Sequence, residues 1–277
     1  MNSMFQRESG KIRPPAVAGR FYPDNPAELH RMIEGFLRGV KSTDTPAPKA
    51  VIAPHAGYVY SGPIAASACA RFAPARAIIK RIVLLGPSHH VSFKGLATTS
   101  AEAFATPLGA VPVDAAAIRD LCARLPQVSV RDEAHAYEHS LEVELPFLQV
   151  VLADFKIVPL AVGDASDEQV AEAIEILWGG DETRFVISSD LSHYHDYATA
   201  RELDTATARA IEELRPQDIG GEQACGRIPV CGLLRAAQKH GLRAQTVDLR
   251  NSGDTAGSRN EVVGYGAFVF AQIESYF

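Results

Sequence analysis

The stretch Arg81-Ile-Val-Leu-Leu-Gly-Pro-Ser-His-His90 joins a short apolar run to a Gly-Pro break and two histidines. A run of this length, rich in aliphatic residues and ended by glycine and proline, is typical of a strand that is buried on both faces. Four similar runs lie elsewhere in the chain, and we predict a buried strand at each of them: 50–53, 155–160, 185–188 and 266–270.

Segments with the apolar spacing of amphipathic helices lie between these strands. Side chains of Asn, Asp, Ser and Thr cap the free amides of a first helical turn, and proline is tolerated inside that turn. We therefore predict helices that begin near Asn25, Asp114, Ser166 (with Gln169), Thr199 (with Glu202) and Pro229. Gly39 and Gly241 are placed to end the first and the last of them. Residues 141–152 also have helical spacing, but Pro146 either kinks that helix or marks its true start.

The alternation of strands and helices indicates the fold class. It predicts an α/β protein, a three-layer αβα sandwich around a doubly wound sheet that is largely parallel or mixed. We expect residues 96–113 and the C-terminal residues to contribute antiparallel strands. No internal repeat or linker divides the 277 residues, so we predict a single domain over 1–277.

Charge and cysteine content exclude several classes of protein. The formal net charge of −6 offers no basic surface for nucleic acid. The four cysteines form no CxxC pair and are too sparse for a disulfide framework, which fits a reducing compartment. No apolar run is long enough for a membrane span, and the first residues lack the apolar core of a secretion signal. We expect a cytoplasmic protein that binds neither nucleic acid nor membrane.

Histidines follow three of the predicted strands. His55 comes after the strand at 50–53, His89 and His90 after the one at 81–85, and His193 after the one at 185–188. Loops at the carboxyl ends of strands form the ligand crevice of open α/β sheets, so these imidazoles are expected to converge. Imidazole suits iron, copper, zinc and nickel. Adjacent residues of an extended segment point to opposite sides, so only one of His89 and His90 faces the site, and their spacing leaves both open.

Two further segments carry candidate site residues. Cys225 lies in a glycine-flanked loop that leads into a helix, where free amides and the helix dipole favour a thiolate, either as metal ligand or as nucleophile. His139 lies among carboxylates in the segment 138–144, where it either serves the site or belongs to the cap of the next helix. Tyr58 and Tyr60 follow His55 and are either pocket walls or core residues.

Five motifs together resemble the Memo family, called AmmeMemoRadiSam system protein B in prokaryotes. They are APHAGYVY at 53–60, LGPSHH at 85–90, EHSLEVELP at 138–146, SSDLSH at 188–193 and CGR at 225–227. That family is similar in fold to the class III extradiol dioxygenases, in which two histidines and a glutamate hold ferrous iron. The Memo pattern has a cysteine where those enzymes have the glutamate.

The resemblance implies a set of roles. His55, His89 and Cys225 would be metal ligands, which selects His89 over His90, and His193 would be the nearby acid or base. Asp190 and His139 are expected to support catalysis there. Iron(II) or copper is the expected cofactor, with zinc as a further candidate, because a thiolate shifts metal preference toward softer ions.

Three functions are compatible with these residues. The first is metal-dependent redox chemistry, dioxygenase-like, on a small-molecule substrate that the sequence does not name. The second is hydrolysis with Cys225 as the nucleophile and His193 as its base. The third is an adaptor that holds a small molecule or peptide in the same crevice without turnover.

Overall fold

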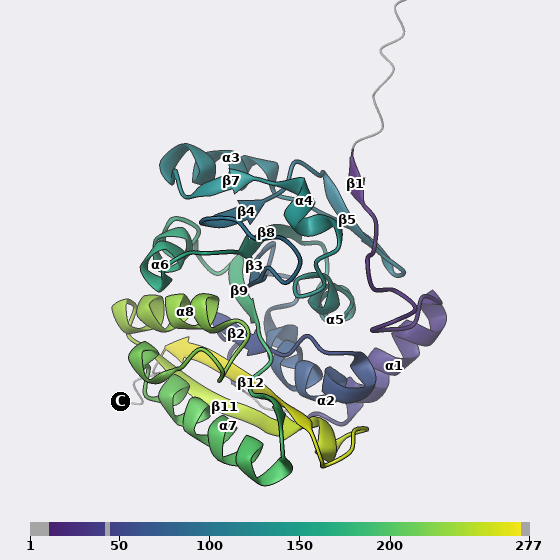
Figure 1. Ribbon diagram of the computed structural model, residues 1–277. Coiled ribbons are helices and arrows are strands. Elements are labelled where there is room, and N and C mark those ends of the chain that lie inside the picture. The colour runs from purple at the N-terminus through teal and green to yellow at the C-terminus, as the bar shows by residue number, and fades with distance from the viewer. Residues whose placement is uncertain (1–10, 42–44, 273–277) are drawn as a thin grey trace, which may run out of the picture.

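The computed structural model describes residues 11–41 and 45–272 (Figure 1). Its centre is a mixed sheet in which the strands lie in the order β10-β12-β2-β9-β3-β8-β4-β7, with β11 paired to β12. The bounds of these strands are β2 Ala50–Ala53, β3 Arg81–Pro87, β4 Leu96–Thr98, β7 Val128–Val130, β8 Lys156–Val162, β9 Thr183–Ser188, β10 His193–His195, β11 Leu242–Asn251 and β12 Val262–Gln272.

Four strands in the middle of this sheet run parallel to one another. They are β2, β9, β3 and β8, and their apolar residues are buried on both faces. Antiparallel strands flank them, since β12 pairs with β2 and β4 pairs with β8. The five runs predicted as strands all lie in this sheet, and its mixed character is confirmed.

A second, smaller sheet contains β1 (Ile12–Arg13), β5 (Ala103–Thr106) and β6 (Gly109–Pro112). β5 and β6 form an antiparallel hairpin, and β11 and β12 form an antiparallel pair at the C-terminal end of the described residues. Both antiparallel contributions were expected from the sequence. β1 pairs with β5 and so brings the N-terminal segment beside the middle of the chain.

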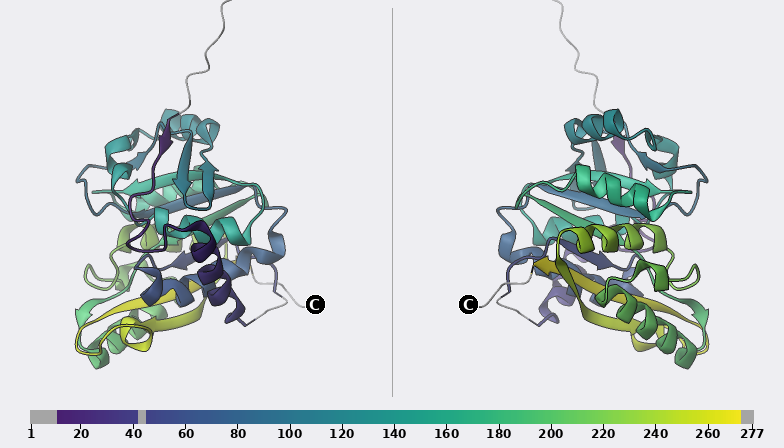
Figure 2. Two further views of the ribbon diagram at one scale, coloured as in Figure 1. Left: turned by 90° about the vertical axis from the view of Figure 1, so that its right-hand side faces the viewer. Right: turned by 90° about the vertical axis from the view of Figure 1, so that its left-hand side faces the viewer.

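Helices cover both faces of the large sheet. In Figure 1, α6 (Asp167–Ile176) and α8 (Arg227–Lys239) lie to the left of the sheet, and α1 (Pro26–Arg38), α2 (Tyr58–Cys69) and α5 (Leu145–Val151) lie to its right. The side views in Figure 2 show the same layers, which form the predicted αβα sandwich. The other elements are α3 (Ala115–Arg124), α4 (Asp132–Ala136), α7 (Tyr197–Glu212), η1 (Ala70–Ala75), η2 (Glu142–Glu144), η3 (Pro216–Asp218) and η4 (Ser252–Asp254). No helix in the described ranges is long and apolar enough to cross a membrane.

Most predicted helix ends are confirmed by side-chain caps. Asn25, Asp114 and Ser166 each accept hydrogen bonds from the first amides of a helix. The start of α7 was predicted wrongly at Thr199, because the carboxylate of Asp196 takes the cap instead, accepting from the amides of Ala198 and Thr199. An ionised carboxylate three residues earlier is a strong acceptor for these amides, and the hydroxyl of Thr199 itself donates to it.

Two helices show how proline acts here. Pro146 lies in the first turn of α5, after the short η2 turn, so it marks the start of the helix rather than a kink within it. α2 was not predicted, because its apolar residues lie on all sides and Pro63 interrupts it. A helix that is buried around most of its circumference has no amphipathic period to detect.

Candidate metal centre

The carboxyl ends of three parallel strands place the first site residues at one edge of the sheet. His55 lies two residues after β2, His89 two residues after β3, and Asp190 two residues after β9. β2 and β3 both pair with β9 in parallel, so these three positions are neighbours in space. This is the crevice that the sequence pattern predicted.

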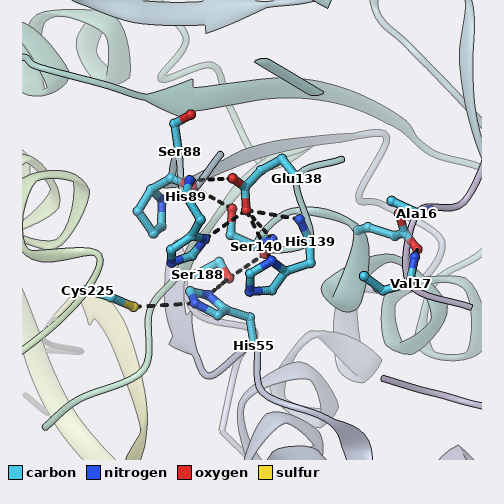
Figure 3. Close-up of polar contacts among 12 residues, drawn as sticks. Ala16, Val17, His55, Ser88, His89, Glu138, His139, Ser140, Ser188 and Cys225 are labelled. Carbon is cyan, nitrogen blue, oxygen red and sulfur yellow. Dashed lines mark hydrogen bonds and ion pairs between the residues drawn. The ribbon is translucent and has the colours of Figure 1, made fainter. Parts of the chain in front are cut away.

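Three imidazoles meet at this edge. The ligand atoms of His55, His89 and His139 all lie within 4.8 Å of one another (Figure 3). The ring of His89 stacks on that of His139 with centroids 4.6 Å apart, and His55 meets both rings edge-on. His139 comes from the loop between α4 and η2 rather than from a strand end. It takes the third place in the cluster that the strand pattern had given to His193.

Hydrogen bonds fix which nitrogen of His55 faces the cluster. Its Nδ1 lies 2.7 Å from the hydroxyl of Ser188, and that hydroxyl donates its own proton to the carbonyl of Ser140. The hydroxyl therefore accepts from Nδ1–H, which leaves the lone pair of Nε2 free for a metal. Burial lowers the pKa of His55, so the ring is neutral at pH 7.

Glu138 fixes which nitrogen of His89 faces the cluster. One carboxylate oxygen lies 2.9 Å from His89 Nδ1 and the other accepts from the His89 amide. Burial alone would raise the pKa of Glu138, but these bonds and the amide of Ser140 hold it well below its usual range. A carboxylate behind a histidine fixes its tautomer and strengthens it as a ligand. His90 has no such carboxylate partner in the described residues, which agrees with the choice of His89.

Cys225, in the loop before α8, contacts His55 but is not one of the three residues whose donor atoms all lie within 4.8 Å of one another. Its Sγ lies 3.4 Å from Nε2 of His55, and its amide donates to the carbonyl of Asp190. Position 226 has room only for glycine, because a Cβ there would lie 2.8 Å from both the carbonyl oxygen of Ser188 and the hydroxyl of Ser189. The loop is thus packed directly against the end of β9.

The ionisation of Cys225 differs from the prediction. The loop and helix start favoured a thiolate, but burial, and then the charge of Asp190, raise the pKa of Cys225 to about 12. Without a cation the thiol is protonated at neutral pH, because the dipole of α8 does not offset the loss of water. A bound metal would supply the missing positive charge and release the proton.

Asp190 and His193 lie around the cluster. A carboxylate oxygen of Asp190 accepts from the amide of His55 at 2.8 Å, and burial raises the pKa of Asp190 to about 7. His193 lines the cavity in front of the cluster, and burial lowers the pKa of His193. His195 lines the same cavity. Of the two tyrosines after His55, Tyr58 is a core residue, whereas Tyr60 is 40% exposed.

The cavity in front of the cluster has a volume of about 740 Å³, within the usual range for a small-molecule site. It is lined by the residues Phe21, His55, Ala56, Gly57, His89, His139, Asp190, His193, Tyr194, His195, Gly221, Glu222, Ala224, Cys225 and Val263. All six predicted site residues are in this set. Sequence reasoning missed the site role of Ser188, the last residue of β9, and of Phe21, for which the sequence held no signal.

The donor set fits a transition metal. Neutral imidazoles and a cysteine sulfur suit iron, copper or zinc, and magnesium or calcium would require oxygen ligands. Two donors on one tetrahedral ion, a nitrogen and a sulfur, are separated by roughly 3.5 Å at ordinary bond lengths. The separation of 3.4 Å between Cys225 Sγ and His55 Nε2 matches that value.

Comparison with known proteins identifies the family. A family model described as a Memo-like protein matches residues 13–269. The chain belongs to the Memo-like family. The resemblance drawn from the five motifs is therefore confirmed. Related MEMO1 family proteins include that of Aquifex aeolicus, 36% identical over 94% of this chain and 99% of that protein, and that of Aeropyrum pernix, 37% identical over 93% and 99%.

A solved structure gives a more distant likeness. The uncharacterized protein JW3007 from Escherichia coli K12 matches with a TM-score of 0.53 and 16% sequence identity. The match covers 78% of this chain and 98% of that one. At this identity the likeness concerns the layered α/β fold alone.

Proposed function

We propose that this Memo-like protein binds iron(II) or copper and oxidises an organic substrate with dioxygen as the electron acceptor. The observation that carries the proposal is the convergence of His55, His89 and His139 within 4.8 Å, with Cys225 in contact with His55. The adjoining cavity of about 740 Å³ gives the substrate a place beside these donors.

His55 Nε2, His89 Nε2 and Cys225 Sγ would hold the ion. Ser188 and Glu138 orient the two imidazoles through their Nδ1 atoms, so both ligands are aligned before metal arrives. When bound, the ion would supply one-electron chemistry and an open position for dioxygen. His139 lies beside the two histidines of this set and offers a fourth donor atom, the third nitrogen.

His193 would accept and return the substrate proton. It lines the cavity, and burial keeps its pKa below the usual value, so its ring is a free base at neutral pH. Asp190 holds the His55 loop through the His55 amide and the Cys225 loop through its own carbonyl, which fixes the distance between the two ligands.

Hydrolysis by a cysteine nucleophile is the second candidate, favoured by the contact of Cys225 with an imidazole. The partner, however, is His55 rather than the expected His193. A raised thiol pKa is also the opposite of what an activated nucleophile requires. A metal-free, readily alkylated Cys225 would be the mark of this alternative.

Metal analysis of anaerobically purified protein tests the proposal. We expect near-stoichiometric metal in the wild type, with a thiolate charge-transfer band, and almost none in His55→Ala or His89→Ala. Cys225→Ala should lose the band and most of the metal. His139→Ala should keep part of the metal, because His55, His89 and Cys225 remain as donors. The exposed His30 on α1 provides the control variant His30→Ala, which should match the wild type. Metal-free wild-type protein, after reconstitution has been attempted, would overturn the proposal.

A further inference from the structure

We propose that the cavity takes a small aromatic molecule that is neutral or positively charged, and that Tyr194 and Glu222 select it. The inference rests on the proposed function, since the ligand would be the substrate of the same centre.

The charge of the wall disfavours anions. Among the described residues that line the cavity there is no Lys or Arg, whereas Asp190 and Glu222 both contribute carboxylates. Glu222 is exposed, and no ion pair to it occurs in the part of the chain that the structure describes. Its charge is therefore available to a ligand. In the metal-free protein, an anionic group on the ligand would meet these carboxylates without a compensating side chain.

Two aromatic side chains give the wall its shape. Phe21 packs against the ring of the cluster residue His139, with ring centroids 4.8 Å apart, and Tyr194 lies on the strand β10 between His193 and His195. Both line the cavity. Aromatic faces bind flat rings and attract cationic groups. Aromatic rings together with carboxylates are the surface that a compact aromatic amine would recognise.

The backbone of Tyr194 is held in an unusual state. Its φ is +59°, in the left-handed region, and Tyr194 is the extra residue of a bulge where β10 pairs with β12. The side chain is 73% exposed, so core packing does not account for this conformation. Bulges beside functional sites redirect a side chain, and strained residues cluster at ligand-binding positions. Tyr194 thus lines the cavity from a position that is unpaired in the β10–β12 ladder.

A matched set of probes tests this inference. 2-Phenylethylamine, 2-phenylethanol and 3-phenylpropionate share one ring and differ in charge, and their binding to the full-length chain is measured by ligand-observed NMR. The protein is first treated with chelator, so that the carboxylate probe has no metal to bind. The same titrations are made with Tyr194→Phe, Tyr194→Gly, Glu222→Gln and the control Glu202→Gln, an exposed glutamate on α7.

We expect the amine to bind most tightly and the carboxylate most weakly. Glu222→Gln should lower the preference for the amine over the alcohol by roughly two- to fivefold, the size of an exposed charge pair. Tyr194→Gly should weaken the binding of the amine and of the alcohol by a similar factor without lowering the melting temperature. Tyr194→Phe should bind both probes as the wild type does. Glu202→Gln should behave as the wild type.

Equal or tighter binding of the carboxylate, an unchanged amine preference in Glu222→Gln, or no detectable binding of any probe at millimolar concentration would overturn the inference. Metal content of the untreated protein is measured on the same preparations. Absent metal with the expected order of probes would overturn the proposed function alone. Full metal with the order reversed would overturn this inference alone.

Discussion

His135 shows how one buried side chain makes stability depend on pH. It is fully buried beside the ring of Phe104, its Nε2 lies 3.1 Å from the carbonyl of Ala97, and its Nδ1 has no partner among the described atoms. Burial lowers the pKa of His135 to about 4. Protonation would place a second positive charge near Arg13, which donates to the His135 carbonyl.

The sign of the effect follows from the lowered pKa. In the unfolded chain the histidine titrates near pH 6.5, so folding keeps a neutral His135 at no cost above that pH. As the pH falls toward about 4, the free energy of unfolding drops by on the order of 3 kcal/mol, because only the unfolded chain takes up the proton. Urea unfolding between pH 4 and 7 checks this. His135→Gln should fall less steeply than the wild type, since glutamine does not titrate. Parallel pH profiles for the two proteins would contradict the prediction.

At the scale of single residues, the sequence was informative where a residue follows a strand. His55 and the pair His89 and His90 could be predicted because a buried parallel strand fixes where the next residues emerge, and the family resemblance then selected His89. For His139 the sequence left a site role and a helix-capping role open, because its loop follows no strand that would fix its position. Its position depends on Arg13, which donates to the Glu138 carbonyl from a segment 125 residues away in sequence.

At the scale of elements, the N-terminal segment is tied to the site by one carboxylate. Glu142, on η2, is fully buried and accepts from the Arg13 guanidinium, from the Tyr22 hydroxyl and from the amides of Ala16 and Val17. The same segment carries Phe21, whose carbonyl accepts from the amide of Tyr58 at 2.7 Å. One buried acceptor therefore anchors the segment that supplies an aromatic wall of the cavity.

Glu142→Gln is expected to destabilise the fold by about 3–5 kcal/mol, because it leaves the buried guanidinium of Arg13 without its counter-charge. Limited proteolysis should then cut residues 13–22 faster, and urea unfolding should shift to lower concentration. Tyr22→Phe removes one hydrogen bond to the same carboxylate and should cost only about 1 kcal/mol. If both variants lost the same small amount of unfolding free energy, the ion pair between Glu142 and Arg13 would not be what holds the N-terminal segment.

Helices and strands could be predicted where residues close together in sequence carry the apolar pattern. The inner strands and the amphipathic helices α1, α6 and α8 show their apolar period in the sequence, and α1 and α6 also show their capping residues. α2 packs against β2, β11, β12 and two other helices, so its burial on nearly all sides erases that period. The path of β10 into its bulge was equally hidden, since it depends on pairing with a strand about 70 residues later.

At the scale of the whole molecule, the proposed ligands join distant parts of the chain. His55, His89, His139 and Cys225 belong to four separate loops, and Cys225 lies 170 residues from its neighbour His55. An ion bound by such a set stabilises the folded state over the unfolded one, where these loops are far apart. Metal should therefore raise the melting temperature of the entire fold rather than of one loop.

Calorimetry of chelator-treated protein with and without added iron(II) under anaerobic conditions measures this effect. At a free metal concentration about 100 times Kd, the expected gain is about 2.7 kcal/mol, or roughly 5 °C for a chain of this size. Cys225→Ala should lose most of the gain. Cys122→Ala, at a half-buried cysteine on α3, should keep the gain, because Cys122 does not line the cavity that Cys225 lines. An equal rise in all three proteins would place the stabilising ion somewhere other than this centre.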